Sequence, residues 1–508
     1  MVDEELNIIE KNRIGTINIL KEKGINPFDN KFIKENIIDD ILSEYNDASK
    51  EFLEENHIHI KTSGRILIIR NFGKASFFRL RDGYGEIQCY IQKGSVSDED
   101  FELFDKFLDA GDICGITGHL FRTKTNELTI KTENIKLLTK SVLPLPEKWH
   151  GLKDIEIRFR KRYVDLIANN DVRDIFKKRA DTINYIRTFL NNSRFLEVET
   201  PIMHANPGGA TARPFKTHHN ALDLELYMRV APELYLKRLL VGGFDRVYEI
   251  GRNFRNEGIS VKHNPEFTML EFYMAYSNYE DMMKFVETML SGLVENICGK
   301  FEINYIGTEI NFTPPFKKIK LQDSLYEVAG FSIEDIDSAD KIIKILQNLN
   351  LPADNNMTYG ELLTVLFEET VESKLLNPTF VTHYPVESSP LARRNDTNQR
   401  VVDRFEFFVA GRELANAFSE LNDPFDQEER FKSQVDVKLK EGLPAEIDED
   451  YIEALKYGLP PAAGCGIGID RLVMLLTNSA SIKDVILFPM EKRLTKTPAA
   501  SGKIEKSN

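Results

Sequence analysis

Between Tyr248 and Tyr276 the chain reads YEIGRNFRNEGISVKHNPEFTMLEFYMAY, with charged residues where a buried sheet would ordinarily be apolar. Two runs of strand-forming residues flank a polar loop, Gly258–Pro265, and predict an antiparallel pair of strands joined by a long turn. Because alternate residues of a strand share a face, Arg255 and Glu257 should point the same way. The same rule groups four residues of the second run: Phe267, Met269, Glu271 and Tyr273. Carboxylates, a guanidinium and aromatic rings on one surface indicate a site for a charged ligand, whereas a solvated sheet with salt bridges would explain any single pair.

The composition indicates a multi-domain globular protein without a membrane span. A chain of 508 residues is too long for one hydrophobic core, and its 42% of hydrophobic residues include no apolar run that could cross a bilayer. The charged N-terminal residues show no signal-peptide pattern, so a cytoplasmic location is expected. A net charge of −14 argues against indiscriminate binding of nucleic acid, and DNA is not an expected partner, although a local basic surface stays open.

The four cysteines are widely separated and form no CxxC pair, which disfavours both a zinc site and a disulfide framework. Each is expected to be a small buried apolar residue: Cys89, Cys114, Cys298 and Cys465. The sequence therefore predicts neither a crosslink nor a structural metal held by cysteine.

Two prolines in LPLPEK, residues 143–148, mark the first domain boundary. Before it, runs that alternate apolar and polar residues between glycine turns predict a closed barrel of about five strands, of the oligonucleotide-binding (OB) type. After it, helices alternate with antiparallel strands, which indicates an α+β domain rather than a doubly wound one. The expected division is a helical segment plus barrel at 1–143, a linker at 144–171, an α+β domain at 172–491 with a mostly helical insertion at 330–380, and a disordered tail at 492–508.

Two local patterns stand out in the α+β domain. Apolar spacing predicts a helix over Val172–Leu190, and RFLEVETPIM, Arg194–Met203, predicts a strand that ends at a proline. Gly464, Gly466 and Gly468 remove side chains at alternate positions of one strand, which would let a planar ligand approach the backbone. This lone GxGxG lacks the strand-turn-helix setting of a dinucleotide fold, so that fold is rejected.

Three segments carry a family resemblance. The opening stretch, with ETPIM at 199–203 and GCGIGIDR at 464–471, resembles the three signature motifs of class II aminoacyl-tRNA synthetases in order and spacing. In detail the chain is similar to bacterial-type lysyl-tRNA synthetases, as in APELYLKRL, ELANAFSELNDP and GIGIDRLVM. One departure is Arg194, which stands where the first motif usually has glycine. The resemblance implies a homodimer that activates L-lysine with ATP to lysyl-adenylate and pyrophosphate, then transfers lysine to the 3′ end of tRNA(Lys).

The resemblance also implies which residues bind ATP. Charge accumulates on phosphate oxygens during activation, and guanidinium groups suit it because they are permanently charged and bind two oxygens at once. A salt bridge with Asp470 or another carboxylate is the alternative for Arg471. The implied roles are α-phosphate and lysine carboxylate for Arg255, the adenine amino group for Glu257, outer phosphates for His263, one face of adenine for Phe267, and the other face together with the γ-phosphate for Arg471.

Magnesium should bridge the phosphates. The resemblance implies about three ions per site, with Glu406 and Glu413 as protein ligands. If residues 410–411 form a two-residue hairpin turn, Phe408 opposes Glu413 and Glu406 lies diagonally on the same face. Strand parity would then turn Asn416 away from that face. A β-bulge between Glu413 and Asn416 is therefore predicted.

Selection of lysine calls for carboxylates, whereas an aspartate pocket would need cationic side chains. Glu233 and Glu271 match the family's ammonium-binding positions, and Tyr273 can hydrogen bond nearby. The rest of the implied lysine site is Asn416, Phe418, Glu420 and the backbone near Gly209.

The barrel combines cations with aromatic residues, as in proteins that bind single-stranded nucleic acid. The implied anticodon-binding residues are Arg70, Phe77, Gln88 and Glu127, with Phe77 stacking on a base. Phe78 should be core, because adjacent strand residues face opposite ways. The basic run RFRKR at 158–162 either contacts tRNA or forms a solvated helix face.

Two other functions are less well supported. Ligases that attach lysine to a protein resemble the catalytic half alone, whereas this chain has the barrel as well. A non-catalytic tRNA-binding relative should have lost at least one residue needed for catalysis. All four of the residues implied for that purpose are present: Arg255, Glu257, Glu413 and Arg471.

Overall fold

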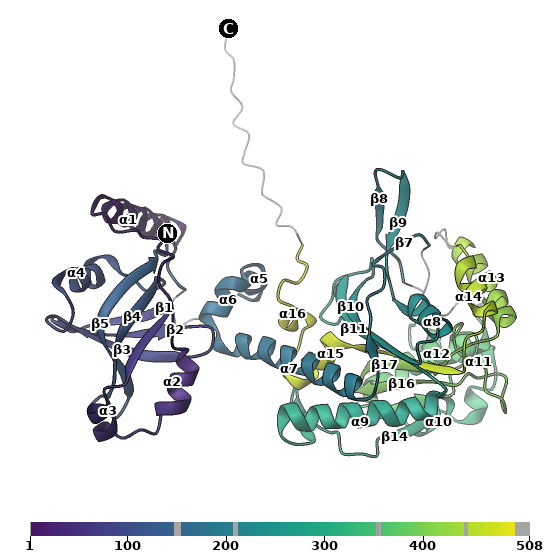
Figure 1. Cartoon of the computed structure of the whole chain (residues 1–508). Coiled ribbons are helices and arrows are strands. Elements are labelled where there is room, and N and C mark those ends of the chain that lie inside the picture. The colour runs from purple at the N-terminus through teal and green to yellow at the C-terminus, as the bar shows by residue number, and fades with distance from the viewer. Residues whose placement is uncertain are drawn as a thin grey trace, which may run out of the picture. The chain divides into compact units, whose positions relative to one another are not determined.

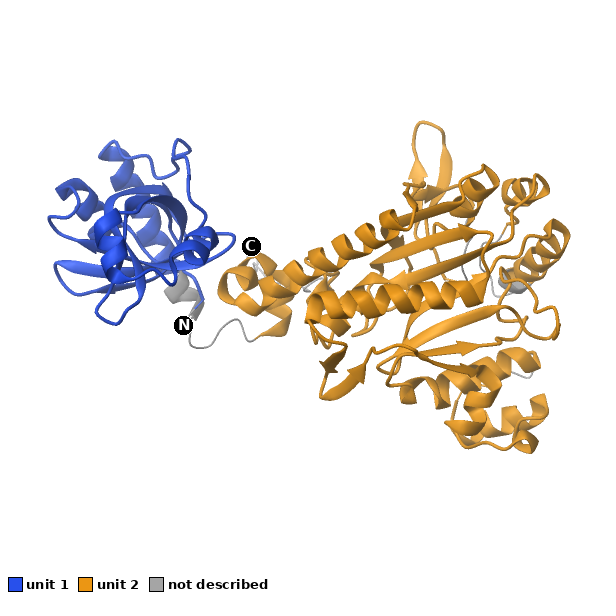
Figure 2. Ribbon diagram, turned by 60° about the horizontal axis from the view of Figure 1, so that its bottom comes forward, with its two compact units in different colours: residues 1–153 blue, residues 154–508 orange. Residues whose placement is uncertain are grey.

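The computed structural model describes residues 2–146, 154–206, 212–351, 353, 357–440 and 446–492. It divides into two compact units, Met1–Lys153 and Asp154–Asn508, which are described separately (Figure 2). The tail predicted to be disordered lies, from residue 493, outside the described residues.

The first unit is a closed five-stranded barrel in the order β1-β2-β3-β5-β4, which confirms the predicted OB-type fold (Figure 1). Its interior is apolar because alternate strand residues point inward, among them Phe78, which is 1% exposed. The strands are β1 (His59–Asn71), β2 (Ala75–Arg81), β3 (Glu86–Gln92), β4 (Ile113–Arg122) and β5 (Leu128–Thr139). The helices are α1 (Val2–Glu22), α2 (Ile38–Tyr45), α3 (Lys50–Asn56) and α4 (Asp98–Phe107).

The second unit is built on an eight-stranded sheet in the order β14-β15-β16-β17-β18-β11-β10-β6. All neighbouring pairs are antiparallel except β14 with β15 and β10 with β6, so the predicted α+β class is confirmed. Its strands are β6 (Leu196–Glu197), β10 (Arg246–Phe254), β11 (Glu266–Ala275), β14 (Lys317–Lys320), β15 (Thr379–Thr382), β16 (Arg404–Val409), β17 (Arg412–Ser419) and β18 (Ala462–Gly468). Two smaller sheets contain β7 (Met203–His204), β8 (Lys216–His219) and β9 (Leu224–Met228), and β12 (Glu302–Tyr305) with β13 (Thr308–Asn311).

Helices cover one face of this sheet and leave the central part of the other face for a pocket. The main core joins the sheet to α7 (Asn170–Asn192), α9 (Tyr279–Cys298) and α15 (Ile469–Leu476). The opposite side carries α8 (Glu233–Val241), with α13 (Pro424–Lys440) and α14 (Glu449–Lys456). The remaining helices are α5 (Ile155–Arg160), α6 (Arg162–Ala168), α10 (Leu321–Glu327), η1 (Ile333–Asp335), α11 (Ala339–Asn348), α12 (Tyr359–Thr370), η2 (Glu372–Lys374) and α16 (Ile482–Val485). Across the described residues, no helix combines the length and apolarity needed to span a bilayer.

Strand β11 shows why the charged stretch folds as a sheet. Leu270, Phe272 and Met274 point into the core against the helices. The intervening residues, Phe267, Met269, Glu271 and Tyr273, line the pocket on the other face, as the alternation predicted. One face of the strand therefore stabilises the fold while the other is free to bind a ligand.

The hairpin of β16 and β17 contains the predicted bulge. Phe408 pairs with Glu413, but Glu406 pairs with Asn416, and the register shifts between these two pairs. Leu414 and Ala415 therefore both point into the core, which returns Asn416 to the pocket face. Residues 410–411 both have positive φ, at 55° and 66°, as a two-residue hairpin turn requires.

The strand predicted over Arg194–Met203 is wrong for most of its length. Leu196–Glu197 forms a short strand at the edge of the sheet, parallel to β10, and Met203 begins β7 in another sheet, but the residues between them are not in a strand. Beyond Glu197, the Thr200 N–H donates to the side chain of Glu249 on β10 rather than to the backbone of that strand. Arg194 adopts φ 66°, the left-handed conformation that the glycine usual in the motif would favour.

The segment predicted as a mostly helical insertion contains α11, α12 and short 3₁₀ turns. It connects β14 to β15, which are adjacent and parallel, and it has an apolar core of its own. A crossover of this kind is the usual link between parallel strands.

Candidate active site

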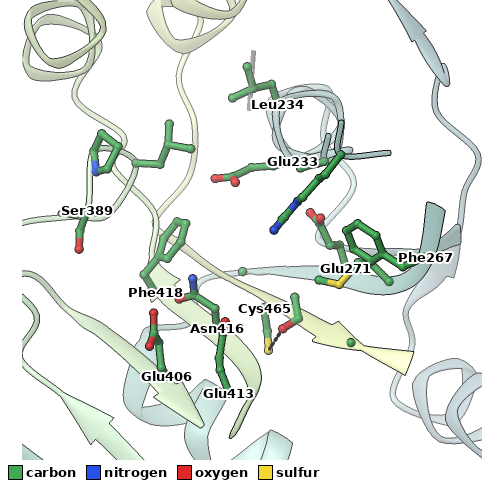
Figure 3. Close-up of a pocket in the computed structure, with 18 of the residues that line it drawn as sticks. Glu233, Leu234, Phe267, Glu271, Ser389, Glu406, Glu413, Asn416, Phe418 and Cys465 are labelled. Carbon is green, nitrogen blue, oxygen red and sulfur yellow. Dashed lines mark hydrogen bonds between the residues drawn. The ribbon is translucent and has the colours of Figure 1, made fainter. Parts of the chain in front are cut away.

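A pocket of about 490 Å³ lies on the sheet face opposite α7 and α9. Its walls come from β11, β16, β17 and β18, from the start of α8, and from the loop between β10 and β11. Figure 3 shows Glu233 and Glu271 extending toward the same space from the helix and from β11, with Glu406 and Glu413 on the β16–β17 side. The pocket thus brings together most of the predicted site residues.

Arg255 and Glu257 line the pocket, but they do not belong to a strand as predicted. Strand β10 ends at Phe254, and the Arg255 N–H makes one last bond to the Pro265 carbonyl. The next N–H, of Asn256, donates to Arg213 instead, and Glu257 bonds back to Arg255. The two side chains are therefore positioned by a loop whose backbone groups are satisfied.

The Arg255 guanidinium lies in the pocket wall beside an aromatic ring. Its central carbon is 5.2 Å from the centre of the Phe267 ring, within range of a cation–π contact. Its Nε is buried and has no hydrogen-bond partner within the described ranges. A buried guanidinium nitrogen without a partner is costly, which favours an anionic ligand at this place.

Arg471 faces the same end of the pocket. Its Nη1 donates to the Glu413 carbonyl at 2.6 Å and lies 3.5 Å from Glu413 Oε2. Asp470 instead pairs with Arg179, at 2.7 Å, and accepts the Thr268 N–H, so the carboxylate near Arg471 is that of Glu413 and not that of Asp470. His263 Nε2 is 3.5 Å from Arg471 Nη2, and burial followed by the Arg471 charge lowers the pKa of His263.

Glu406 and Glu413 form an acidic region beside these cations. Tyr384 donates to Glu406 Oε2 at 2.8 Å, and Arg404 holds the other oxygen at 2.5 Å. Burial raises the pKa of Glu406, and the neighbouring Glu413 adds to this effect. Two carboxylates suit Mg²⁺, which keeps water and phosphate oxygens as its other ligands. Among the residues described, no set of three or more His, Cys, Asp or Glu could hold a metal ion.

Arg404 links the predicted metal and amino-acid sites. Besides Glu406, its guanidinium donates to the Asn416 side chain at 3.0 Å and to the Ser389 hydroxyl at 2.7 Å. Its central carbon lies 4.5 Å from the centre of the Tyr384 ring. These contacts fix a charged side chain of β16 in one orientation, so Arg404 is a positioning residue that the sequence analysis missed.

The carboxylates of Glu233 and Glu271 lie in another part of the pocket. Glu233 begins α8, Glu271 lies on β11, and both line the pocket. Tyr273 donates to Glu271 Oε2 at 3.1 Å. Burial, followed by the nearby Glu233 charge, raises the pKa of Glu271 to about 8. A cationic ligand would relieve this repulsion.

The remaining predicted lysine-site residues fall into three groups. Asn416 and Phe418 line the pocket. Glu420 is 1% exposed and lies behind the wall, in contact with the ammonium group of Lys237. Gly209 lies outside the described residues.

Glycines of β18 form part of the wall, as their alternation predicted. The strand continues directly into α15, with Gly468 as the N-cap, so the strand-to-helix junction was missed. At Gly464 an added Cβ would lie 2.2 Å from the Tyr273 ring and 2.3 Å from Glu420 Oε1. Glycine is therefore required for these two side chains to stand where they do.

Gly464→Ala is expected to raise the KM for the amino acid by roughly tenfold or more, because the methyl group must displace Tyr273 and Glu420. The KM for ATP should change little, since neither residue is among the predicted ATP ligands. Steady-state pyrophosphate exchange at varied amino acid and varied ATP measures both values. An equal rise in both would show a general collapse of the pocket instead.

On the barrel, the predicted anticodon residues share one outer face. Arg70 pairs with Phe77 across β1 and β2, and Gln88 lies opposite Arg79, which makes an ion pair with Glu127. The structure adds an aromatic cluster that sequence reasoning missed. Around Phe77 lie Phe72, with ring centres 6.2 Å apart, and Tyr90, at 4.9 Å, followed by Phe121.

Comparison with known proteins agrees with this geometry. A family model described as tRNA synthetases class II (D, K and N) matches residues 154–492, and one described as OB-fold nucleic acid binding domain matches residues 60–138. The chain is 52% identical to the lysine--tRNA ligase of Legionella pneumophila (strain Lens) over 489 residues, 96% of this chain and 97% of that protein. It is 50% identical to that of Carboxydothermus hydrogenoformans, covering 96% and 99% of the two chains, and 49% identical to that of Bacillus thuringiensis, covering 96% and 98%. The chain belongs to the lysine–tRNA ligase family of class II tRNA synthetases.

Proposed function

We propose that the pocket activates L-lysine with ATP, releasing pyrophosphate, and that the lysyl group then passes from the adenylate to the 3′ end of tRNA(Lys). The observation that carries this proposal is the grouping of charge in one pocket. The guanidinium groups of Arg255 and Arg471 both lie near His263, and the carboxylates of Glu233 and Glu271 lie near each other. Lysine and ATP together present the complementary pattern of phosphate, carboxylate and ammonium.

In this arrangement each side chain binds and orients one part of the reactants. Arg255 would hold the α-phosphate and the lysine carboxylate in line, and Phe267 would stack on adenine while Glu257 accepts from its amino group. His263 and Arg471 would bind the outer phosphates. Glu406 and Glu413 would hold about three Mg²⁺ ions, which when bound neutralise charge on the phosphate oxygens.

Specificity would come from the acidic end of the pocket. Glu233 and Glu271 would take the ammonium groups of lysine with Tyr273, and an aspartate or asparagine side chain offers no positive charge to these carboxylates. Asn416, Phe418 and Glu420 would complete the site, with the Gly209 backbone at the α-amino end.

Lysine-dependent ATP–pyrophosphate exchange by the full-length protein tests the proposal. L-Lysine should support exchange, whereas L-aspartate and L-asparagine should not. Charging of tRNA that carries a lysine anticodon should follow in the presence of all three substrates. No exchange by pure folded protein would instead favour a non-catalytic tRNA-binding protein.

We also propose that residues 1–143 bind the anticodon, that 144–171 link the two domains, and that 172–491 form the catalytic domain, with 330–380 as its insertion. The clustered rings around Phe77 support the first assignment, because bases stack on aromatic side chains. The basic run at 158–162 is largely engaged within its own unit. Arg162 is buried and pairs with Asp165 at 2.7 Å.

Phe77→Ala is expected to raise the KM for tRNA about 5- to 150-fold, the equivalent of the roughly 1–3 kcal/mol that stacking of one base provides. Lysine-dependent pyrophosphate exchange without tRNA should be unchanged, because Phe77 belongs to the other compact unit. Tyr84→Ala is the matched control, since Tyr84 is exposed in the turn at the far end of β2. Equal loss of exchange and charging would count against separate roles for the two units.

A homodimer and a cytoplasmic location complete the proposal. Exposed apolar side chains near the edge strand β6 support a dimer contact there: Leu196 is 46% exposed, Ile202 44% and Met203 54%. Measuring the mass of the protein in solution tests the dimer.

A further inference from the structure

Lys237 is a fully buried lysine directly behind the acidic end of the pocket. It lies on α8 one turn after Glu233, and its side chain is 0% exposed. Its Nζ is 2.6 Å from Glu233 Oε1 and makes a close ion pair with Glu420 Oε2. The same atom lies 5.2 Å from the centre of the Phe418 ring. The chain's own ammonium group therefore contacts three side chains assigned above to the substrate.

The charges of this cluster do not balance. Glu233, Glu271 and Glu420 are all buried or nearly so, and burial together with the Glu233 charge raises the pKa of both Glu271 and Glu420. Lys237 supplies one positive charge, which leaves two carboxylates uncompensated, and burying an unpaired charge is costly. Free lysine carries two ammonium groups. Glu420 Oε1 is buried without a hydrogen-bond partner in the described part of the chain, which leaves an acceptor for one of them.

Resting on the proposed function, we infer that Lys237 is a positioning residue for amino-acid selection. Its ammonium group fixes the Glu233 and Glu420 carboxylates and supplies part of the positive charge that balances them. The substrate lysine supplies the rest. Lys237 acts through these two glutamates and does not line the pocket itself. A substrate without an ammonium side chain would leave the cluster with unpaired negative charge. Lys237 thus determines how much positive charge a ligand must carry to balance the carboxylates around the pocket.

An ordinary helical ion pair does not account for this arrangement. Exposed pairs four residues apart stabilise a helix only weakly. Lys237 is instead buried and joins α8 to the residue that follows β17, about 180 positions later in the chain. The contact fixes two separate elements around the pocket, and so it bears on the geometry of the site.

The pH dependence of lysine binding distinguishes this role of Lys237 from a purely structural one. Burial raises the pKa of Glu420, and the Lys237 charge lowers it. Without Lys237 the carboxylate would ionise only at higher pH, and only the ionised form attracts an ammonium group. The charged or titratable groups that face Lys237 are Glu233, Glu420 and Tyr451. Those that face Glu420 are Lys237, Glu233 and Glu271, and Tyr273 lies beside them.

Lys237→Met, made in the full-length protein, tests the inference by lysine-dependent exchange across a pH series. The KM for lysine should rise roughly tenfold or more near neutral pH, while the KM for ATP stays within about twofold. The acid side of the pH profile of kcat/KM for lysine should move up by about one unit or more. Lys140→Met is the matched control: Lys140 is equally buried, pairs with Asp109 and Asp112, and lies in the barrel unit, so exchange should be unchanged.

A second variant covers the case in which Lys237→Met leaves too much unpaired charge to fold. Lys237→Met combined with Glu420→Gln removes both charges of the ion pair, which is far less costly than removing one. Its lysine KM should remain high, but the acid side of its pH profile should not move up, because the carboxylate that shifts is absent.

Three results would overturn the inference: an unchanged lysine KM in either variant, a parallel rise in the KM for ATP, or an equal pH shift in the double variant. Absence of lysine-dependent exchange by the unmodified protein would instead contradict the proposed function, so the two failures are distinguishable.

Discussion

Arg255→Ala is expected to lower kcat for lysine-dependent ATP–pyrophosphate exchange by about two to three orders of magnitude. Attack of the lysine carboxylate on the α-phosphorus places new negative charge on phosphate oxygens. A fixed guanidinium at that place stabilises the transition state more than the bound reactants. Arg255 meets this requirement, because its side chain lies against Phe267 and its buried Nε has no partner within the described residues.

Two further substitutions distinguish the effect of the positive charge from that of the guanidinium geometry and from a loss of folding. Arg255→Lys keeps a positive charge but not the planar fork that binds two oxygens, so it should recover only part of the rate. Arg252→Ala is the matched control: Arg252 lies three residues earlier, is 41% exposed, and makes a 3.6 Å ion pair with Glu266. It does not line the pocket. A loss below tenfold for folded Arg255→Ala would contradict the assignment of Arg255 to the α-phosphate.

The pocket face could be predicted from the sequence because a strand repeats every two residues. Tyr273 and Glu271 share a face by that rule alone, and they line the pocket together. The bulge in β17 was also predictable, since Glu413 and Asn416 had assigned roles that a regular strand would place on opposite faces. The first prediction needs only the local spacing, whereas the second also needed the roles that the family resemblance implies.

Contacts between distant segments could not be read in this way. Strand β10 ends before Arg255, and the N–H of Asn256 donates to the carbonyl of Arg213, about forty residues earlier. The sequence pattern of the strand nevertheless continues through these residues. Lys237 reads as an ordinary helical lysine until the fold brings Glu420 against it. Arg404 likewise needs Ser389 and Asn416 around it to become a positioning residue. Buried ion pairs of this kind depend on tertiary packing, which has no signature in the spacing of either partner.

Glu271→Gln is expected to raise the KM for lysine at least tenfold, and by more if the full roughly 2–5 kcal/mol of a buried charge partner is lost. The substitution keeps the size of the side chain and can still accept from Tyr273, but it removes the negative charge. The KM for ATP should be unaffected. Glu266→Gln on the same strand is the matched control, because its side chain is 48% exposed and pairs with Arg252 rather than facing the pocket.

The raised pKa of Glu271 adds a pH dependence whose sign is fixed. Burial, followed by the Glu233 charge, raises this pKa to about 8. Glu271 faces Glu233, Glu249, Tyr273 and Arg229. Because only the ionised carboxylate pairs with an ammonium group, kcat/KM for lysine in the unmodified protein should fall as pH drops below about 8, and below that pH the binding of lysine should release the proton of the Glu271 carboxyl.

Glu271→Gln should lose that part of the pH profile, since glutamine does not titrate in this range. The combination of a raised lysine KM with a flatter acid side is specific to a carboxylate that pairs with the substrate. A structural role for Glu271 would lower kcat/KM at every pH and would raise the KM for ATP as well. An unchanged lysine KM would leave Glu233 and Glu420 as the partners of the ammonium groups and would remove Glu271 from the site.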